Sequence, residues 1–345
     1  MKLQPLLLFF STIAVYVVIP AWAEAQAYCR LRDPITQIRT LYPESDAHRS
    51  IVRTVDMETR ETVSESLPFD LHFNELGRHT LYVAQNEMRP LGVVHARTEK
   101  GSWGLIEIAW AIDFNMRIVG FEFQRCRSPE KKAVDSDYFR ELVSNKTLDE
   151  LRGLLSEDHT RLAVPRLSWS DAAEKLAVSS IQSAMKTLVV TENVWRDDLP
   201  VLSAFSNALP TFSAAVGIVP VNDVYTDRTH EILAEKDLAK TDLGIERSGV
   251  VVFRVQDVEN AVIGYTVIMP WIYEGTTRQI VWNIDADHRV VNVKSATGWA
   301  SKEIQTAFEL AIGLSPETKA EDCSTFTQLI ACEAIVVTST DAGRG

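Results

Sequence analysis

The sequence has few cysteines, and none of them lies in a metal-binding or haem-attachment pattern. It contains four cysteines and seven histidines in 345 residues, and neither C-x-x-C nor C-x-x-C-H occurs. Structural zinc sites and covalently attached haem use such closely spaced ligands. We therefore expect no metal ion.

The sequence also has fewer basic residues than acidic ones. The chain has 35 lysines and arginines against 47 aspartates and glutamates, which gives a net charge of −12. An acidic surface repels a phosphate backbone, so we expect no nucleic-acid partner. The sequence contains no G-x-S-x-G run and no other recognisable nucleophile–base arrangement, so it does not indicate a hydrolase.

The only long hydrophobic run lies at the N-terminus. Lys2 is the only charged residue before residue 24, and the apolar stretch at residues 6–20 is followed by Ala21, Trp22 and Ala23. This pattern predicts a signal peptide at residues 1–23 and a periplasmic or secreted mature chain. The alternative is an uncleaved N-terminal membrane anchor, because the stretch from Leu6 to Trp22, about 17 residues, is near the lower limit for a spanning helix.

An exported chain with four cysteines can form two disulfides, and three pairings are open. Cys323 and Cys332 would close a short local loop. Cys29 with Cys126 would then be the remaining pair.

An internal repeat is the most informative feature of the sequence. Residues 79–123 match residues 251–295 without a gap after a shift of 172 positions, with the shared pattern I-x-W-x-I-D-x-x-x-R-[IV]-V. Apolar residues alternate on both sides of the aspartate, which is typical of a β-hairpin. Matched pairs include Gly92 with Gly264, Trp110 with Trp282, Asp113 with Asp285 and Arg117 with Arg289. This identity favours a duplication.

The pattern predicts an α+β protein of two similar units, each an antiparallel meander of about four strands flanked by helices. Helices are predicted at residues 33–41, 137–143, 148–155, 170–190, 229–239 and 301–314. The expected organisation is a signal peptide (1–23), a first domain (29–190), a linker (191–228) and a second, shorter repeat (229–338).

Residues 33–190 resemble the FMN-binding domain family. The resemblance rests on a leading helix that ends in Leu41, Tyr42 and Pro43, the strands through Gly92 to Asp113, and a late helix. The family includes the flavin subunits of Rnf-type and sodium-pumping NADH:quinone reductase complexes and the periplasmic domain of a nitrous-oxide-reduction regulator. The resemblance implies FMN binding and electron transfer to a membrane or exported redox protein.

Two family motifs that contact the flavin are degraded here. In the loop that corresponds to E-T-P-G-L-G, the chain has Arg127, Ser128 and Pro129 but no glycine. In the late helix it keeps Ser179 and Ser180, and Ala177 replaces the threonine that carries FMN in the family, so attachment there would be noncovalent. The resemblance therefore implies that Arg127, Ser128, Pro129, Ser179 and Ser180 contact the cofactor. Neighbouring basic residues Arg125, Lys131 and Lys132 would add counter-charge.

Two functions remain open at this point. The chain is either a noncovalent flavin electron carrier or redox accessory, or a flavin-free relative of that domain that acts as a periplasmic binding or assembly module. The retained loop proline and serine pair favour the first, and the missing glycines and threonine favour the second. Small residues at 177–180 could also serve only to let the late helix pack closely.

Overall fold

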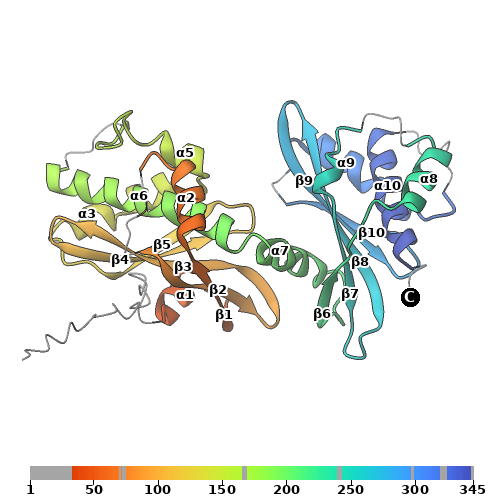
Figure 1. Cartoon of the computed structure of the whole chain (residues 1–345), viewed down its shortest axis with the longest axis horizontal. Coiled ribbons are helices and arrows are strands. Elements are labelled where there is room, and N and C mark those ends of the chain that lie inside the picture. The colour runs from red at the N-terminus through yellow and green to blue at the C-terminus, as the bar shows by residue number, and fades with distance from the viewer. Residues whose placement is uncertain are drawn as a thin grey trace, which may run out of the picture.

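The computed structural model describes residues 33–69, 71, 75–164, 169–238, 243–296, 299–318 and 325–342. It contains two antiparallel five-stranded sheets with helices packed against them, which confirms the predicted α+β class. The sheets lie in separate halves of the molecule (Figure 1). Each sheet has one strand more than the four predicted, because each meander is preceded by an additional edge strand.

The described residues of the first unit, which spans residues 35–194, form five strands and six α-helices. Its elements are α1 (Ile35–Leu41), β1 (Ala47–Val55), α2 (Met57–Glu65), β2 (Gly77–Asn86), β3 (Arg89–Gly101), β4 (Gly104–Ile112), β5 (Ile118–Arg125), α3 (Lys131–Val134), α4 (Asp137–Val143), α5 (Leu148–Arg152) and α6 (Asp171–Val194). The strands pair in chain order, so β3 is the central strand.

The second unit, residues 198–342, repeats this order with fewer helices after its last strand. Its elements are α7 (Asp198–Ala208), β6 (Gly217–Pro220), α8 (Asp227–Glu235), the 3-10 turn η2 (Arg247–Gly249), β7 (Val251–Gln256), β8 (Val262–Tyr273), β9 (Thr276–Asp285), β10 (Val290–Ser295), α9 (Lys302–Glu309) and α10 (Phe326–Ala342). Its strands also pair in chain order, with β8 in the centre.

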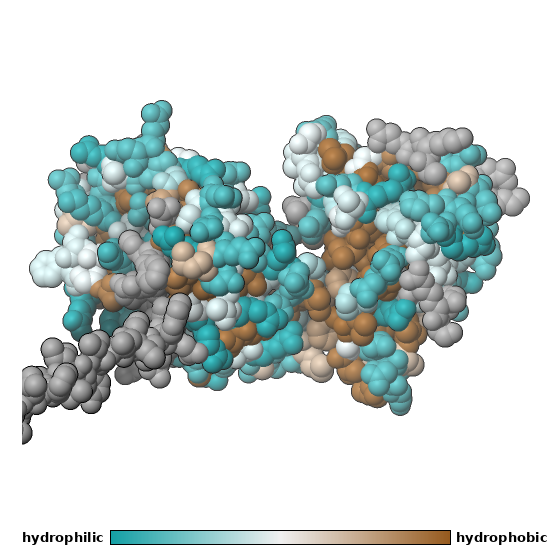
Figure 2. Space-filling view, viewed as in Figure 1, coloured by the Kyte–Doolittle hydropathy of each residue, from teal (hydrophilic) through white to brown (hydrophobic). Residues whose placement is uncertain are grey.

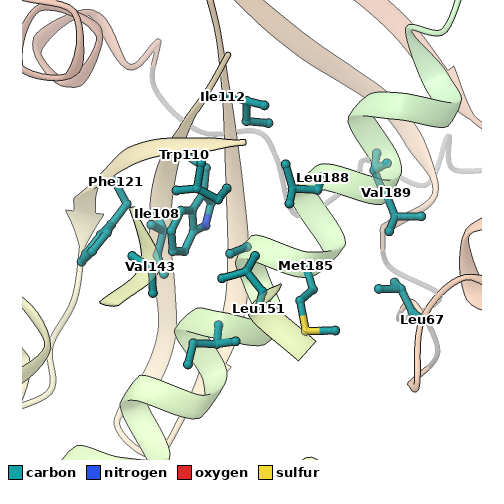
Figure 3. Packing of buried hydrophobic residues seen from close by; sticks show 14 of the residues in the cluster. Leu67, Ile108, Trp110, Ile112, Phe121, Val143, Leu151, Met185, Leu188 and Val189 are labelled. Carbon is teal, nitrogen blue, oxygen red and sulfur yellow. The ribbon is translucent and has the colours of Figure 1, made fainter. Parts of the chain in front are cut away.

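The main core of the first unit lies between its sheet and α6. Alternate residues of β4 point towards α6, where Trp110 packs opposite Met185 and Leu188 (Figure 3). The indole nitrogen of Trp110 donates a hydrogen bond to Ser183 Oγ at 3.1 Å. Trp110 is therefore a core residue whose polar edge has a partner.

The opposite face of the same sheet is covered by α1 and the residue that follows it. Small side chains allow this close approach: Ala84, Ala96, Ala109 and Ala111. Tyr42 lies on this face and donates a hydrogen bond to the carbonyl oxygen of Ile112 at 2.9 Å. A Cβ atom on Gly92 would lie only 2.1 Å from the Tyr42 hydroxyl, so this position requires glycine.

The two units share detailed geometry in their meanders. Trp110 pairs with Phe121 and Trp282 pairs with Val293, which is the same register after the shift of 172. Each hairpin turn begins with an aspartate, Asp113 or Asp285, whose carboxylate accepts two backbone N–H groups. The glycines also correspond, because a Cβ on Gly264 would lie 2.5 Å from the ring of Phe212.

The structure corrects the ungapped sequence match at one place. Gly92 lies opposite Ala84, whereas Gly264 lies opposite Val255 rather than residue 256. The chain from Val255 to Gly264 is therefore one residue longer than the chain from Ala84 to Gly92. The shift of 172 holds from β3 onwards, and the strands before it are related by 171.

The region predicted as a linker, residues 191–228, contains the end of α6, all of α7 and strand β6. Helix α7 contacts β3 of the first sheet and strands β6–β9 of the second. Leu202 of α7 belongs to the core of the first unit, while Ala204 and Ala208 pack on the second sheet. A helix that packs on both units joins them.

We expect Gly92→Ala to lower the free energy of unfolding by about 3 kcal/mol, because the added methyl group would meet the Ile112 carbonyl oxygen at 2.8 Å as well as Tyr42. Gly120→Ala is the matched control. Its Cβ would meet only the flexible Leu41 side chain at 3.3 Å, so the expected cost is below about 1 kcal/mol. Urea unfolding followed by tryptophan fluorescence compares the two. Equal stability of both variants would contradict the assigned packing of Tyr42.

Candidate functional site

The loop predicted to contact flavin lies between β5 and α3. Ser128 is half-buried, and its hydroxyl accepts the backbone N–H of Glu130 at 3.2 Å. Arg127 and Pro129 are exposed. Helix α3 packs against α6, so this loop and the late helix are neighbours. The serine and proline keep the geometry of a turn that starts a short helix.

The second predicted contact, Ser179 and Ser180, lies in the third turn of α6. The helix begins at Asp171 after the N-cap Ser170, so its free backbone N–H groups are about two turns away from these serines. Ser180 is buried and donates its hydroxyl hydrogen to the Leu176 carbonyl oxygen at 2.9 Å. Ala177 is buried in the core. Two of the basic residues expected to supply counter-charge also have acidic partners, Arg125 with Glu107 and Lys131 with Asp135.

The cysteine pairings fall partly outside the described residues. Cys126 is half-buried and Cys332 is buried. Cys29 and Cys323 are not among the residues that the structure describes, so both pairings stay predictions.

A cluster of buried charged side chains, which sequence analysis missed, lies between the first sheet and α6. Arg97 of β3 forms an ion pair with Glu75. Lys186 of α6 lies 2.8 Å from Glu99 of β3 and 3.4 Å from Glu75. Each of these four side chains is at least nine-tenths buried. We call Glu75, Arg97, Glu99 and Lys186 the ionic cluster.

Two buried histidines extend the ionic cluster along the sheet. His79 Nε2 lies 2.7 Å from the Glu75 carbonyl oxygen, His79 Nδ1 lies 3.3 Å from His95 Nε2, and His95 Nδ1 lies 3.2 Å from Thr191 Oγ1. The carbonyl can only accept, so each imidazole donates through Nε2 and accepts through Nδ1. This chain of hydrogen bonds requires both rings to be neutral.

The pKa values of the two histidines agree with this arrangement. Burial and the nearby Arg97 guanidinium lower the pKa of His79 to about 4. Burial, Arg97 and His79 hold the pKa of His95 well below its usual value. Both rings are therefore neutral at pH 7.

The second unit shows that this fold does not require the charges. His95, Arg97 and Glu99 occupy successive positions of β3 that face α6, and in the matching register β8 has Val267, Met269 and Trp271. These three residues are buried and apolar. Hydrophobic residues usually replace a buried ion pair at little cost or with a gain in stability. Because the second unit has apolar residues at these three positions, the ionic cluster is specific to the first unit.

Arg97 is not fully satisfied within the ionic cluster. Its Nε and Nη1 atoms are buried and have no hydrogen-bond partner among the described residues. In the second unit, by contrast, the buried Glu333 of α10 accepts hydrogen bonds from Arg247 Nε at 2.8 Å and from the Tyr225 hydroxyl at 2.7 Å. The ionic cluster is therefore the less well satisfied of the two charged groups.

An open cavity of about 810 Å³ lies between the two units. The β2–β3 hairpin of the first unit forms one wall, and the segment from the end of α7 to β6 forms the other. Its lining residues are Glu44, Asn86, Glu87, Met88, Arg89, Leu91, Leu209, Pro210, Ser213, Ala215 and Val216. The second unit exposes hydrophobic side chains beside the boundary (Figure 2). We call this cavity the interunit cleft.

None of the five residues predicted to contact flavin lines the interunit cleft. Within the described ranges, no group of histidine, cysteine, aspartate and glutamate side chains is arranged to hold a metal ion. The helices described are all too short or too polar to span a bilayer. Comparison with protein-family models and with curated proteins finds no match for this chain.

Proposed function

We propose that this chain is an exported, flavin-free binding protein that holds a small ligand in the interunit cleft. The observation that supports the proposal is the cavity itself, to which both units contribute walls. Its volume of about 810 Å³ falls within the usual range for small-molecule sites, and such sites often lie between domains. Its lining combines apolar side chains with a few charged ones, which is also typical of ligand sites.

The alternative is the noncovalent flavin carrier with a membrane or exported redox partner. The loop with Ser128 and Pro129 and the pair Ser179 and Ser180 still favour this alternative. The buried, hydrogen-bonded hydroxyl of Ser180 and the distance of both serines from the start of α6 favour the flavin-free proposal. Absorbance spectroscopy distinguishes the two.

The first test uses residues 24–345 purified from a flavin-replete periplasm. We expect no flavin absorbance and no uptake of added FMN. We also expect native mass spectrometry to detect a small molecule bound from the low-molecular-mass fraction of a periplasmic extract. A yellow protein that releases FMN on acid precipitation would contradict the flavin-free proposal.

A matched pair of variants locates the bound molecule. Ser213 is exposed and lines the interunit cleft, so Ser213→Trp would fill part of it and lower the bound fraction at least tenfold. Ala214 is the next residue, is also exposed and does not line the cleft, so Ala214→Trp should bind as the unmodified chain does. Equal binding by both variants would place the ligand elsewhere.

A further inference from the structure

The interunit cleft carries charged side chains of both signs from the first unit. Glu87 and Arg89 lie at the β2–β3 hairpin, and Glu44 lies in the segment after α1. None of these three side chains forms an ion pair with any residue that the structure describes. Unpaired charges of both signs that line one cavity are suited to a ligand that also carries both signs.

A second cation reaches this region from the other unit. Lys294 lies on β10, and its pKa is lowered by burial and by the positive charge of Arg89. Lys294 is not among the residues that line the interunit cleft, so the cation that faces the cleft is Arg89. Arg89 has no acidic partner among the described residues, so it is suited to an anionic group on a ligand.

The charged hairpin is held in place before any ligand arrives. The backbone N–H of Glu87 donates to the Asp46 carboxylate at 3.0 Å, and the Asn86 side chain donates to the Glu44 carbonyl oxygen at 2.8 Å. A preformed site loses less entropy when it binds its ligand.

The remaining wall of the interunit cleft is apolar. Leu91 faces it from the first unit, and Leu209, Pro210 and Val216 face it from the second. Met88 is 47% exposed at the hairpin tip, and Val216 is 39% exposed. An aliphatic ligand would remove these side chains from water, at about 25 cal/mol for each Å² buried.

We propose that the interunit cleft binds a short zwitterionic peptide with aliphatic side chains, an inference that rests on the proposed function. Arg89 takes the terminal carboxylate, Glu87 and Glu44 take the terminal ammonium group, and the apolar wall takes the side chains. Arginine suits a carboxylate because its planar guanidinium can donate two parallel hydrogen bonds. A simple anion fits less well, since Glu44 and Glu87 repel it.

The probe for this proposal is the dipeptide leucyl-leucine, compared with two capped forms. N-acetylation removes the ammonium group, and C-terminal amidation removes the carboxylate. Isothermal titration calorimetry on residues 24–345 should show that the free dipeptide binds at least tenfold more tightly than either capped form.

Charge-neutralising variants assign each terminus to its partner. Arg89→Gln should weaken binding of the free dipeptide at least tenfold and leave binding of the amidated form unchanged. Glu87→Gln should weaken the free dipeptide and leave the acetylated form unchanged. Arg49→Gln and Glu61→Gln are the controls, because both residues are exposed and lie outside the cleft.

The outcomes separate this inference from the proposed function. If Arg89→Gln weakens the free and amidated peptides equally, or if the capped forms bind as tightly as the free one, the zwitterionic assignment is wrong. If no dipeptide binds, but the Ser213→Trp variant no longer binds a molecule that the unmodified chain takes from the extract, the zwitterionic assignment is also wrong and the cleft remains a ligand site. If Ser213→Trp changes the binding of neither the dipeptide nor the molecule from the extract, both proposals fail.

Discussion

Arg97→Met is expected to destabilise the first unit by about 3–5 kcal/mol. The substitution removes the partner of Glu75 and leaves that carboxylate next to Glu99, with Lys186 as the one remaining cation of the ionic cluster. An uncompensated charge in a buried site is costly because water no longer solvates it. Urea unfolding followed by tryptophan fluorescence measures the loss.

The informative control replaces all four charges together. Glu75→Leu, Arg97→Met, Glu99→Leu and Lys186→Met would give the first unit an apolar layer like the one the second unit has at Val267, Met269 and Trp271. We expect this fourfold variant to be more stable than Arg97→Met alone, since no charge is left without a partner. If it is less stable than the single variant, the fold of the first unit depends on the charges themselves.

Acid is expected to destabilise the first unit through His79 and His95. The pKa of His79 is about 4 in the folded chain, and an unfolded histidine has a pKa near 6.5. The unfolded state therefore binds more protons in this range, and stability falls as the pH drops from about 6.5 towards 4. For His79 alone the loss at the low end is about 3 kcal/mol, and His95 adds to it because its pKa is lowered as well.

The charged groups around the two rings oppose each other at this pH. Burial and Arg97 disfavour protonation of His79, while the carbonyl and the carboxylate of Glu75 favour it. The hydrogen bonds that require neutral rings are the two that an Nδ1 atom accepts, in His79 from His95 Nε2 and in His95 from the Thr191 hydroxyl. Burial is the largest of these effects, and the pKa values of His79 and His95 are therefore lowered.

Replacing both histidines by the corresponding residues of the second unit tests whether His79 and His95 cause the acid sensitivity. His79→Val and His95→Val reproduce Val250 and Val267, and the double variant should lose most of the acid sensitivity between pH 6.5 and 4. Its unfolding free energy, measured by urea titration across that range, should vary less steeply than that of the unmodified chain. An unchanged slope would mean that other groups cause the acid sensitivity.

Much of the fold was accessible from local patterns. The alternation around Trp110 and Trp282 predicted the hairpins, and the helix predicted at residues 170–190 starts within one residue of α6. Strands β1 and β6 were missed because β1 is exposed along most of its length and β6 has only four residues. Helix α10 was missed because apolar residues surround much of it and leave no clear period of 3.6.

The candidate sites were harder to predict from the sequence than the fold. The ionic cluster joins Glu75, Arg97, Glu99 and Lys186 from three separate parts of the chain, and only tertiary packing brings them together. One signal was nevertheless present: His95, Arg97 and Glu99 alternate in a strand whose copy has apolar residues at those positions. The interunit cleft had no such signal, since its walls come from a loop and from a segment predicted as a linker.

Under the proposed function, helix α7 has a consequence for the kinetics of ligand binding. It packs on both sheets, and the contact between Arg53 and Asp198 at 2.7 Å fixes its first turn to the first unit. A cleft held open by such a helix needs no domain closure to receive a molecule. Association should then proceed without a slow conformational step, at the rate that diffusion and orientation allow, and differences in affinity between ligands should arise from how fast each one leaves.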